Sequence, residues 1–90
     1  MTTSEPSVDP RAVDVSVTED DLSVQLVDGR RVIVPRAWFP RLLHATDEQR
    51  GNWRLIGDGQ GIHWPDLDED LSVAGLLRGA AAPGASRRAV

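Results

Sequence analysis

Residues 12–34, AVDVSVTEDDLSVQLVDGRRVIV, give the clearest indication of the fold class. Apolar and polar residues alternate in it repeatedly, which is typical of strands with one buried face. The acidic triplet at residues 19–21 interrupts the alternation as one turn. Asp28-Gly29 supplies a second turn, because glycine accepts the positive φ that a tight hairpin requires. The predicted strands cover Val13–Val17, Leu22–Leu26 and Arg31–Val34. Their short links predict an antiparallel meander, whose polar face carries Asp14, Ser16, Ser23 and Gln25.

A short helix is predicted directly after the meander, where the apolar period changes. Trp38, Leu42 and Ala45 are spaced as on one face of a helix. Pro40 is tolerated only in a first helical turn, so we expect the helix over Ala37–His44.

A second helical turn, a hairpin and a final helix are predicted in the remaining part of the domain. Thr46-Asp47-Glu48-Gln49 is a capping-box pattern that starts a helical turn ending near Gly51. Residues 53–55 and 62–64 are expected to form strands joined by the glycine-rich turn 57–61. Residues 66–70 are expected to be an acidic connector. Ser72 is expected to cap the last helix and Gly79 to end it.

The predicted fold is therefore α+β: a small single domain, an antiparallel strand meander of order βββ-α-ββ-α with short helices, over residues 12–79. Residues 1–11 and 80–90 are rich in proline or small residues and lack apolar periodicity, so we expect disordered tails. The predicted core consists of Val15, Val24, Leu26, Val32, Val34, Leu42, Leu55, Ile62 and Leu76. A core of this size is only marginally stable, which favours association with a partner.

Composition narrows the classes of function. The formal net charge is -4, so the chain repels nucleic-acid phosphates unless its charges segregate. It has no cysteine, and every basic residue other than histidine is arginine. No apolar run reaches the roughly 18 residues of a membrane span, and the N-terminus lacks a signal-peptide pattern. We therefore expect a cytoplasmic protein that does not bind membranes.

Motifs for metal, phosphate or acyl chemistry are incomplete. Residues 66–70 begin like a calcium loop, but the sixth position is Leu71 and the twelfth is Leu77. His44 and His63 lack a metal-binding spacing. The glycine-rich turn lacks the ending of a phosphate-binding loop, and no serine lies in a GxSxG pattern. We predict no catalytic residue, no cofactor and no metal.

The three tryptophans, Trp38, Trp53 and Trp64, share the middle of the chain with several arginines. Core packing is one explanation. Recognition is the other, because tryptophan and arginine are favoured anchors of protein interfaces.

Residues 29–77, GRRVIVPRAWFPRLLHATDEQRGNWRLIGDGQGIHWPDLDEDLSVAGLL, resemble the bacterial family called domain of unknown function 2442. The resemblance rests on DGR, VP…WFPRL, NWRLIGDGQGIHWPDLDEDLSV and GLL in this order and spacing. It implies a small α+β domain and brings no known activity or catalytic residue. It also implies a two-gene arrangement beside another small protein, of the toxin–antitoxin or regulatory kind. Some members carry a helix-turn-helix segment after this domain, but the short stretch after Gly79 leads us to expect none here.

The leading hypothesis is a non-enzymatic bacterial partner-binding protein, the antitoxin-like or regulatory half of a two-gene module. Its partner is expected to be a small, basic protein encoded nearby; nucleic acid would be reached only indirectly, and self-association is left open. The predicted partner-binding surface consists of Arg41, Arg54, Asp58, His63, Asp66, Asp68, Glu69 and Asp70. The alternatives are a nucleic-acid-binding regulator with an arginine-bearing face and, less favoured, a metal-dependent enzyme built on His63 and residues 66–70.

Overall fold

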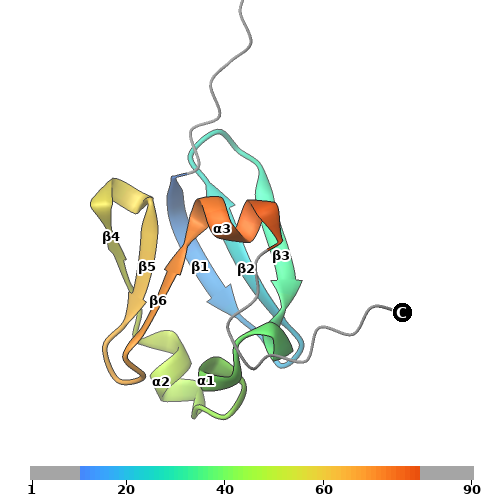
Figure 1. The fold of residues 1–90 in the computed structure, drawn as a ribbon, viewed down its shortest axis with the longest axis vertical. Helices are drawn as coiled ribbons and strands as arrows, with labels where there is room; N and C mark the ends of the chain where they lie inside the picture. The colour runs from blue at the N-terminus through green and yellow to red at the C-terminus, as the bar shows by residue number, and fades with distance from the viewer. Residues whose placement is uncertain (1–10, 80–90) are drawn as a thin grey trace, which may run out of the picture.

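A computed structural model describes residues 11–79. The predicted tails, residues 1–11 and 80–90, lie outside this range except for Arg11. Two three-stranded antiparallel sheets are joined by short helices (Figure 1). The predicted α+β class is thus confirmed, with one strand more than the sequence indicated.

The first sheet, sheet A, contains β1 (Ala12–Val17), β2 (Asp21–Leu26) and β3 (Arg31–Pro35) in that order. Its register aligns Val15 with Val24, and Leu22 with Val34, on the face that is buried. Gly29 has a φ of +97° in the β2–β3 turn, which explains the preference for glycine there. The meander predicted from residues 12–34 is therefore confirmed.

β1 departs from the predicted alternation at its start. Val13 is 51% exposed, whereas Ala12 is buried. The pairing with β2 shifts register between Ala12 and Asp14. Val13 is the extra residue of β1 at this shift, because Ala12 and Asp14 pair with the adjacent residues Leu26 and Gln25. An extra residue interrupts the alternation of a strand, so Val13 points outward although Val15 points inward.

The predicted helix over residues 37–44 is divided. A 3-10 turn, η1 (Arg36–Trp38), precedes α1 (Pro40–Leu43). Phe39 between them is extended, with φ -127° and ψ 91°, because the ring of a following proline disfavours helical backbone. Pro40 occupies the first helical turn as predicted, and Phe39 is buried in the core.

α2 (Asp47–Gly51) begins with the predicted capping box. The main-chain N–H of Gln49 donates to Thr46 Oγ1 over 3.1 Å, and the N–H of Thr46 donates to Gln49 Oε1 over 2.9 Å. Two donors that the helix itself leaves unpaired are satisfied in this way.

The second sheet, sheet B, contains β4 (Arg54–Ile56), β5 (Gly61–Trp64) and β6 (Glu69–Ser72), with the 3-10 turn η2 (Gly57–Gly59) between the first two strands. The acidic connector predicted over residues 66–70 is therefore too long, because Glu69 and Asp70 already belong to β6. Leu71 of β6 pairs with Ile62 and is buried. A single inward apolar residue gives a strand this short no visible periodicity.

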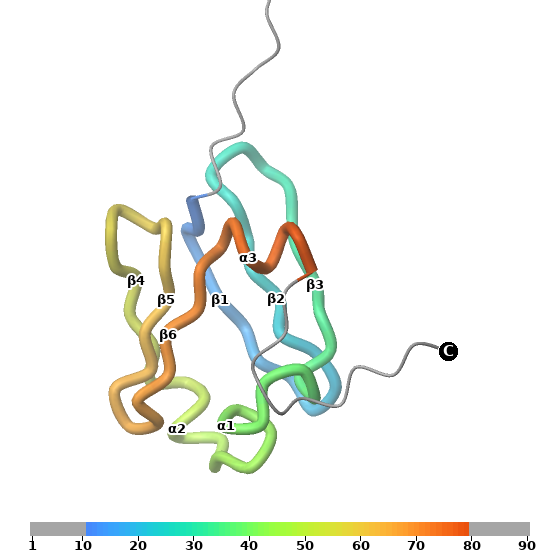
Figure 2. The backbone as a smooth tube through the Cα atoms, viewed as in Figure 1, coloured from blue at the N-terminus to red at the C-terminus, as the bar shows by residue number. Residues whose placement is uncertain are grey.

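α3 (Val73–Arg78) follows β6 directly and packs against β3 (Figure 2). The N–H of Gly75 donates to Ser72 Oγ over 3.1 Å, which confirms Ser72 as the cap. Gly79 ends the helix in the left-handed conformation, with φ +83°, as its position predicted.

The core lies between the two sheets and the helices. Most of the predicted core residues are buried; Val32 and Leu55 are half-buried and pack against it. The largest fully buried side chain is Trp64, whereas Trp38 and Trp53 are partly buried against the core. All three tryptophans thus have a packing role. Among residues 11–79, no helix has both the length and the apolarity to cross a bilayer.

Gly59 sits where η2 approaches the start of β1. Its φ is +93°, and a Cβ atom there would lie 2.5 Å from the carbonyl oxygen of Ala12. Gly29 has a similar φ but no atom within 4 Å of the same position. We therefore expect Gly29→Ala to cost about 1–2 kcal/mol from backbone strain alone, and Gly59→Ala to cost about 1–3 kcal/mol more. Urea unfolding of both variants measures the difference, and equal costs would contradict the close approach.

Leu42 is fully buried in α1, whereas Leu77 of α3 is 38% exposed. Truncating a well-buried leucine leaves a cavity, so Leu42→Ala should lower the free energy of unfolding by about 2–5 kcal/mol. Leu77→Ala is the matched control and should cost much less. Thermal unfolding of the two variants tests this. An unchanged melting temperature for Leu42→Ala would show that α1 does not pack as described.

Candidate functional site

The predicted partner-binding residues are divided between the two ends and the outer face of sheet B. The turn of η2, which carries Asp58, lies at one end of the sheet, and the β5–β6 turn lies at the other (Figure 1). Asp58 is therefore not brought together with Asp66 and Asp68. Its φ is +58°, a conformation that aspartate tolerates better than most residues.

Arg54, His63 and Asp70 form a row across the outer face of sheet B. Arg54 is opposite His63 in the β4–β5 pair, and His63 is opposite Asp70 in the β5–β6 pair. His63 Nδ1 contacts Asp70 Oδ1 directly. His63 points outward, because its neighbours Ile62 and Trp64 point inward and are fully buried.

Arg41 and Glu69 stabilise the β5–β6 turn. Arg41 Nη1 donates to the main-chain carbonyl oxygens of Asp68 and Leu67 and lies 3.7 Å from Glu69 Oε1. The Glu69 side chain is only 12% exposed. Burial raises the pKa of Glu69, while the charge of Arg41 opposes the rise. These two members of the predicted surface are therefore held by contacts within the domain.

Asp66 and Asp68 remain available at the same turn. Asn52 Nδ2 donates to Asp66 Oδ2 over 3.0 Å, and Asp66 is still exposed. Asp68 is exposed and has a φ of +51°. A partner that approaches this turn meets both carboxylates.

Segments distant in sequence meet beside this turn. The β1–β2 turn, η1, α1, α2 and the β5–β6 turn lie at one end of the molecule (Figures 1 and 2). The N–H of Arg36 donates to the carbonyl oxygen of Asp20, and Arg41 and Asn52 reach the β5–β6 turn. We call this the acidic end. Its carboxylates belong to Glu19, Asp20, Asp21, Asp47, Glu48, Asp66, Asp68 and Glu69.

The arginines of the acidic end donate to main-chain carbonyl groups. Arg36 Nη1 donates to Thr18 over 2.9 Å. Arg50 donates through Nε to Leu42 over 2.7 Å and through Nη2 to Leu43 over 2.8 Å. Together with Arg41, these are three guanidinium groups among eight carboxylates. The positive charges are thus fixed by internal contacts, and most of the carboxylates face solvent.

The sequence prediction missed five carboxylates of this surface: Glu19, Asp20, Asp21, Asp47 and Glu48. The acidic triplet at residues 19–21 is visible in the sequence, but only as a turn. Nothing local relates it to residues 66–68, because the fold alone brings the two turns to the same end. Within residues 11–79, no three side chains of the His, Asp or Glu type are grouped so that they could hold a metal ion.

Known proteins resemble this chain in sequence and in fold. The family model described as protein of unknown function (DUF2442) matches residues 12–82. A crystal structure of a protein of unknown function from Rhodospirillum rubrum is similar, with a TM-score of 0.72 and 30% identity over 86% of this chain and 95% of that chain. The solution NMR structure of an uncharacterised protein from Chromobacterium violaceum has the same fold, with a TM-score of 0.69 and 24% identity over 82% of this chain and 70% of that chain. No curated protein matches the chain.

Two carboxylates should give opposite pH dependences of stability. The raised pKa of Glu69 means that its contribution is full below the ordinary glutamate pKa and is lost as the pH rises through the raised value. In the β2–β3 turn, a hydrogen bond from the N–H of Arg30 lowers the pKa of Asp28. The contribution of Asp28 is therefore present above the ordinary aspartate pKa and is lost as the pH falls through the lowered value.

Glu69→Gln should consequently gain stability relative to the wild type as the pH rises from about 3 to 7, and Asp28→Asn should lose it over the same interval. Urea unfolding at several pH values measures both trends. If the two differences had the same sign of slope, the assigned burial of Glu69 or the turn contact of Asp28 would be wrong.

Proposed function

We propose that this chain, which belongs to the family of proteins of unknown function DUF2442, is a non-enzymatic protein that binds a basic protein partner through its acidic end. The observation that carries the proposal is that the positive and negative groups of this end differ in their contacts. The arginines are engaged by carbonyl groups of the domain, and exposed carboxylates surround them.

The chemistry of this end suits a partner that presents several lysine or arginine side chains. Carboxylates from three separate segments, residues 19–21, 47–48 and 66–69, give a broad negative surface in place of a single ion-binding point. Such a surface accelerates the encounter with a basic protein and suppresses binding of acidic ones. It also repels phosphates, so it favours a protein partner over direct nucleic-acid binding.

We further propose that the partner is encoded nearby and that the chain is the antitoxin-like or regulatory half of a two-gene module. The family resemblance in the sequence implies such an arrangement. An acidic protein can mask a basic, nucleic-acid-directed partner by covering its positive surface. The small core supports this assignment, because a marginally stable domain gains stability from a bound partner.

The test compares partner binding by isosteric neutralisation variants. Glu19→Gln/Glu48→Gln removes two exposed charges of the acidic end, neither of which makes a side-chain hydrogen bond or ion pair within residues 11–79. We expect co-purification with the neighbouring gene product for the wild type. For the variant we expect association at least about threefold slower, with less dependence on salt concentration.

Asp58→Asn/Asp70→Asn is the matched control. It removes the same amount of charge from sheet B away from the acidic end and should change association much less. Stopped-flow binding over a range of salt concentrations separates the two variants. If the neighbouring product did not bind the wild type, or if both variants bound like the wild type, the proposal would be rejected. A larger effect of the control would instead place the surface on the row of His63 and Asp70.

A further inference from the structure

The outer face of sheet A is open and polar. It turns away from the core, as the polar alternation of residues 14–25 predicted. The register places its side chains in two cross-strand rows. One row is Asp14, Gln25 and Arg31, and the other is Ser16, Ser23 and Ile33.

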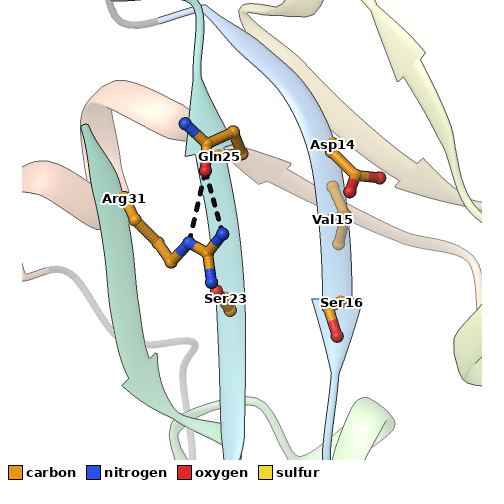
Figure 3. A pocket seen from close by; sticks show the side chains of 6 residues that line it. All are labelled: Asp14, Val15, Ser16, Ser23, Gln25 and Arg31. Atoms are coloured by element: carbon orange, nitrogen blue, oxygen red, sulfur yellow. Dashed lines mark hydrogen bonds between the residues drawn. The ribbon is translucent and has the colours of Figure 1, made fainter. Parts of the chain in front are cut away.

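The first row carries opposite charges at its two margins. Asp14 lies on edge strand β1 and Arg31 on edge strand β3, with Gln25 of β2 between them (Figure 3). Arg31 donates through Nε and Nη2 to Gln25 Oε1, over 3.3 and 3.1 Å, so its guanidinium is held against the sheet. Within residues 11–79, neither Asp14 nor Arg31 has an ion-pair partner. Two exposed side chains of opposite charge are thus left without an ion pair among these residues.

The second row combines two small serine side chains with one exposed, large apolar side chain. The small Ser16 and Ser23 side chains line a shallow pocket together with Asp14, Gln25 and Arg31 of the first row, as the side chains in Figure 3 show. Ile33, opposite Ser23 on β3, is 58% exposed, the largest exposure among the large apolar side chains of residues 11–79. Covering an apolar side chain this exposed with another surface is favourable, because it removes apolar area from water.

We infer that this face binds a second copy of the chain in a symmetric dimer whose two-fold axis runs along β2. That rotation places β1 of one copy over β3 of the other. Asp14 then meets the partner's Arg31, and Arg31 meets the partner's Asp14, so all four charges are paired. Ile33 at the same time covers the partner's Ser16.

A second copy fits this face better than a different partner does. An interface with two-fold symmetry must be complementary to itself, and a row that is negative at one margin and positive at the other meets that requirement. A uniformly basic or acidic partner would match one margin and be repelled by the other. Two sheets can pack face to face with their strands nearly aligned.

The dimer should be weak. Three strands of this length present a face of roughly 300 Å², which is less than half of what each partner contributes to a standard interface. Association should therefore be concentration-dependent and weaken with salt, because solvent screens its charge pairs. This face is separate from the acidic end, so dimerisation and partner binding can fail independently of each other.

Charge-swap variants of the full chain provide the test. Asp14→Arg places like charges opposite each other in its own dimer, and so does Arg31→Asp. We expect analytical ultracentrifugation to show dimerisation of the wild type between about 10 µM and 1 mM, and each variant alone to associate at least about tenfold more weakly. A mixture of the two variants in equal amounts pairs all four charges again and should recover the wild-type association.

Arg54→Asp makes the same charge change as Arg31→Asp, but on the outer face of sheet B, and should dimerise like the wild type. Circular dichroism and thermal unfolding establish that every variant is folded. The proposal is overturned if the wild type remains monomeric at about 1 mM, because even a weak interface should associate at that concentration. It is also overturned if either single variant dimerises like the wild type, or if the mixture of folded variants does not associate.

Discussion

The contact between Arg50 and Trp64 holds sheet B against the two short helices. The indole Nε1–H of fully buried Trp64 donates to the carbonyl oxygen of Arg50 over 2.9 Å. The guanidinium of Arg50 in turn donates to Leu42 and Leu43, the last residues of α1. One residue of α2 thereby connects sheet B to α1. Because α1 and α2 are each about one turn long, contacts of this kind hold them in place where helix propensity alone is insufficient.

The same use of arginine explains why one end of the molecule is acidic. Short helices and tight turns leave many carbonyl groups without partners inside their own element. Arg36, Arg41 and Arg50 satisfy carbonyl groups of three such segments. A guanidinium suits this role because it carries several donors in a rigid plane. The positive charge is therefore required by the fold, and most of the carboxylates around it are exposed to solvent.

The two sheets present surfaces of different character because their outer faces are constructed differently. Sheet A has opposite charges at its margins and an exposed Ile33. In sheet B, His63 lies between Arg54 and Asp70, and its contact with Asp70 already uses one carboxylate. The sheets meet where η2 approaches β1, and only glycine at position 59 permits that distance. One domain of this size thus presents both an acidic end and a separate sheet face with residues of opposite charge on its two edge strands.

Local sequence patterns were sufficient to predict the features that depend on neighbours a few residues apart. The Asp28-Gly29 turn, the Thr46–Gln49 capping box and the helix limits at Ser72 and Gly79 formed as predicted. So did the burial of Ile62, a member of the predicted core. These features follow from backbone preferences and side-chain spacing, which act within one segment.

The tertiary structure alone decided the features that need a distant partner. β6 is a strand because β5 offers its hydrogen-bonding edge, although residues 69–72 lack a strand pattern. The exposure of Val13 depends on a register shift against β2. The acidic end combines turns that are more than forty residues apart in sequence, so no local pattern could relate Asp20 to Asp68. Strand pairing and the proximity of charges depend on distances in space, and these distances are fixed only when the core has formed.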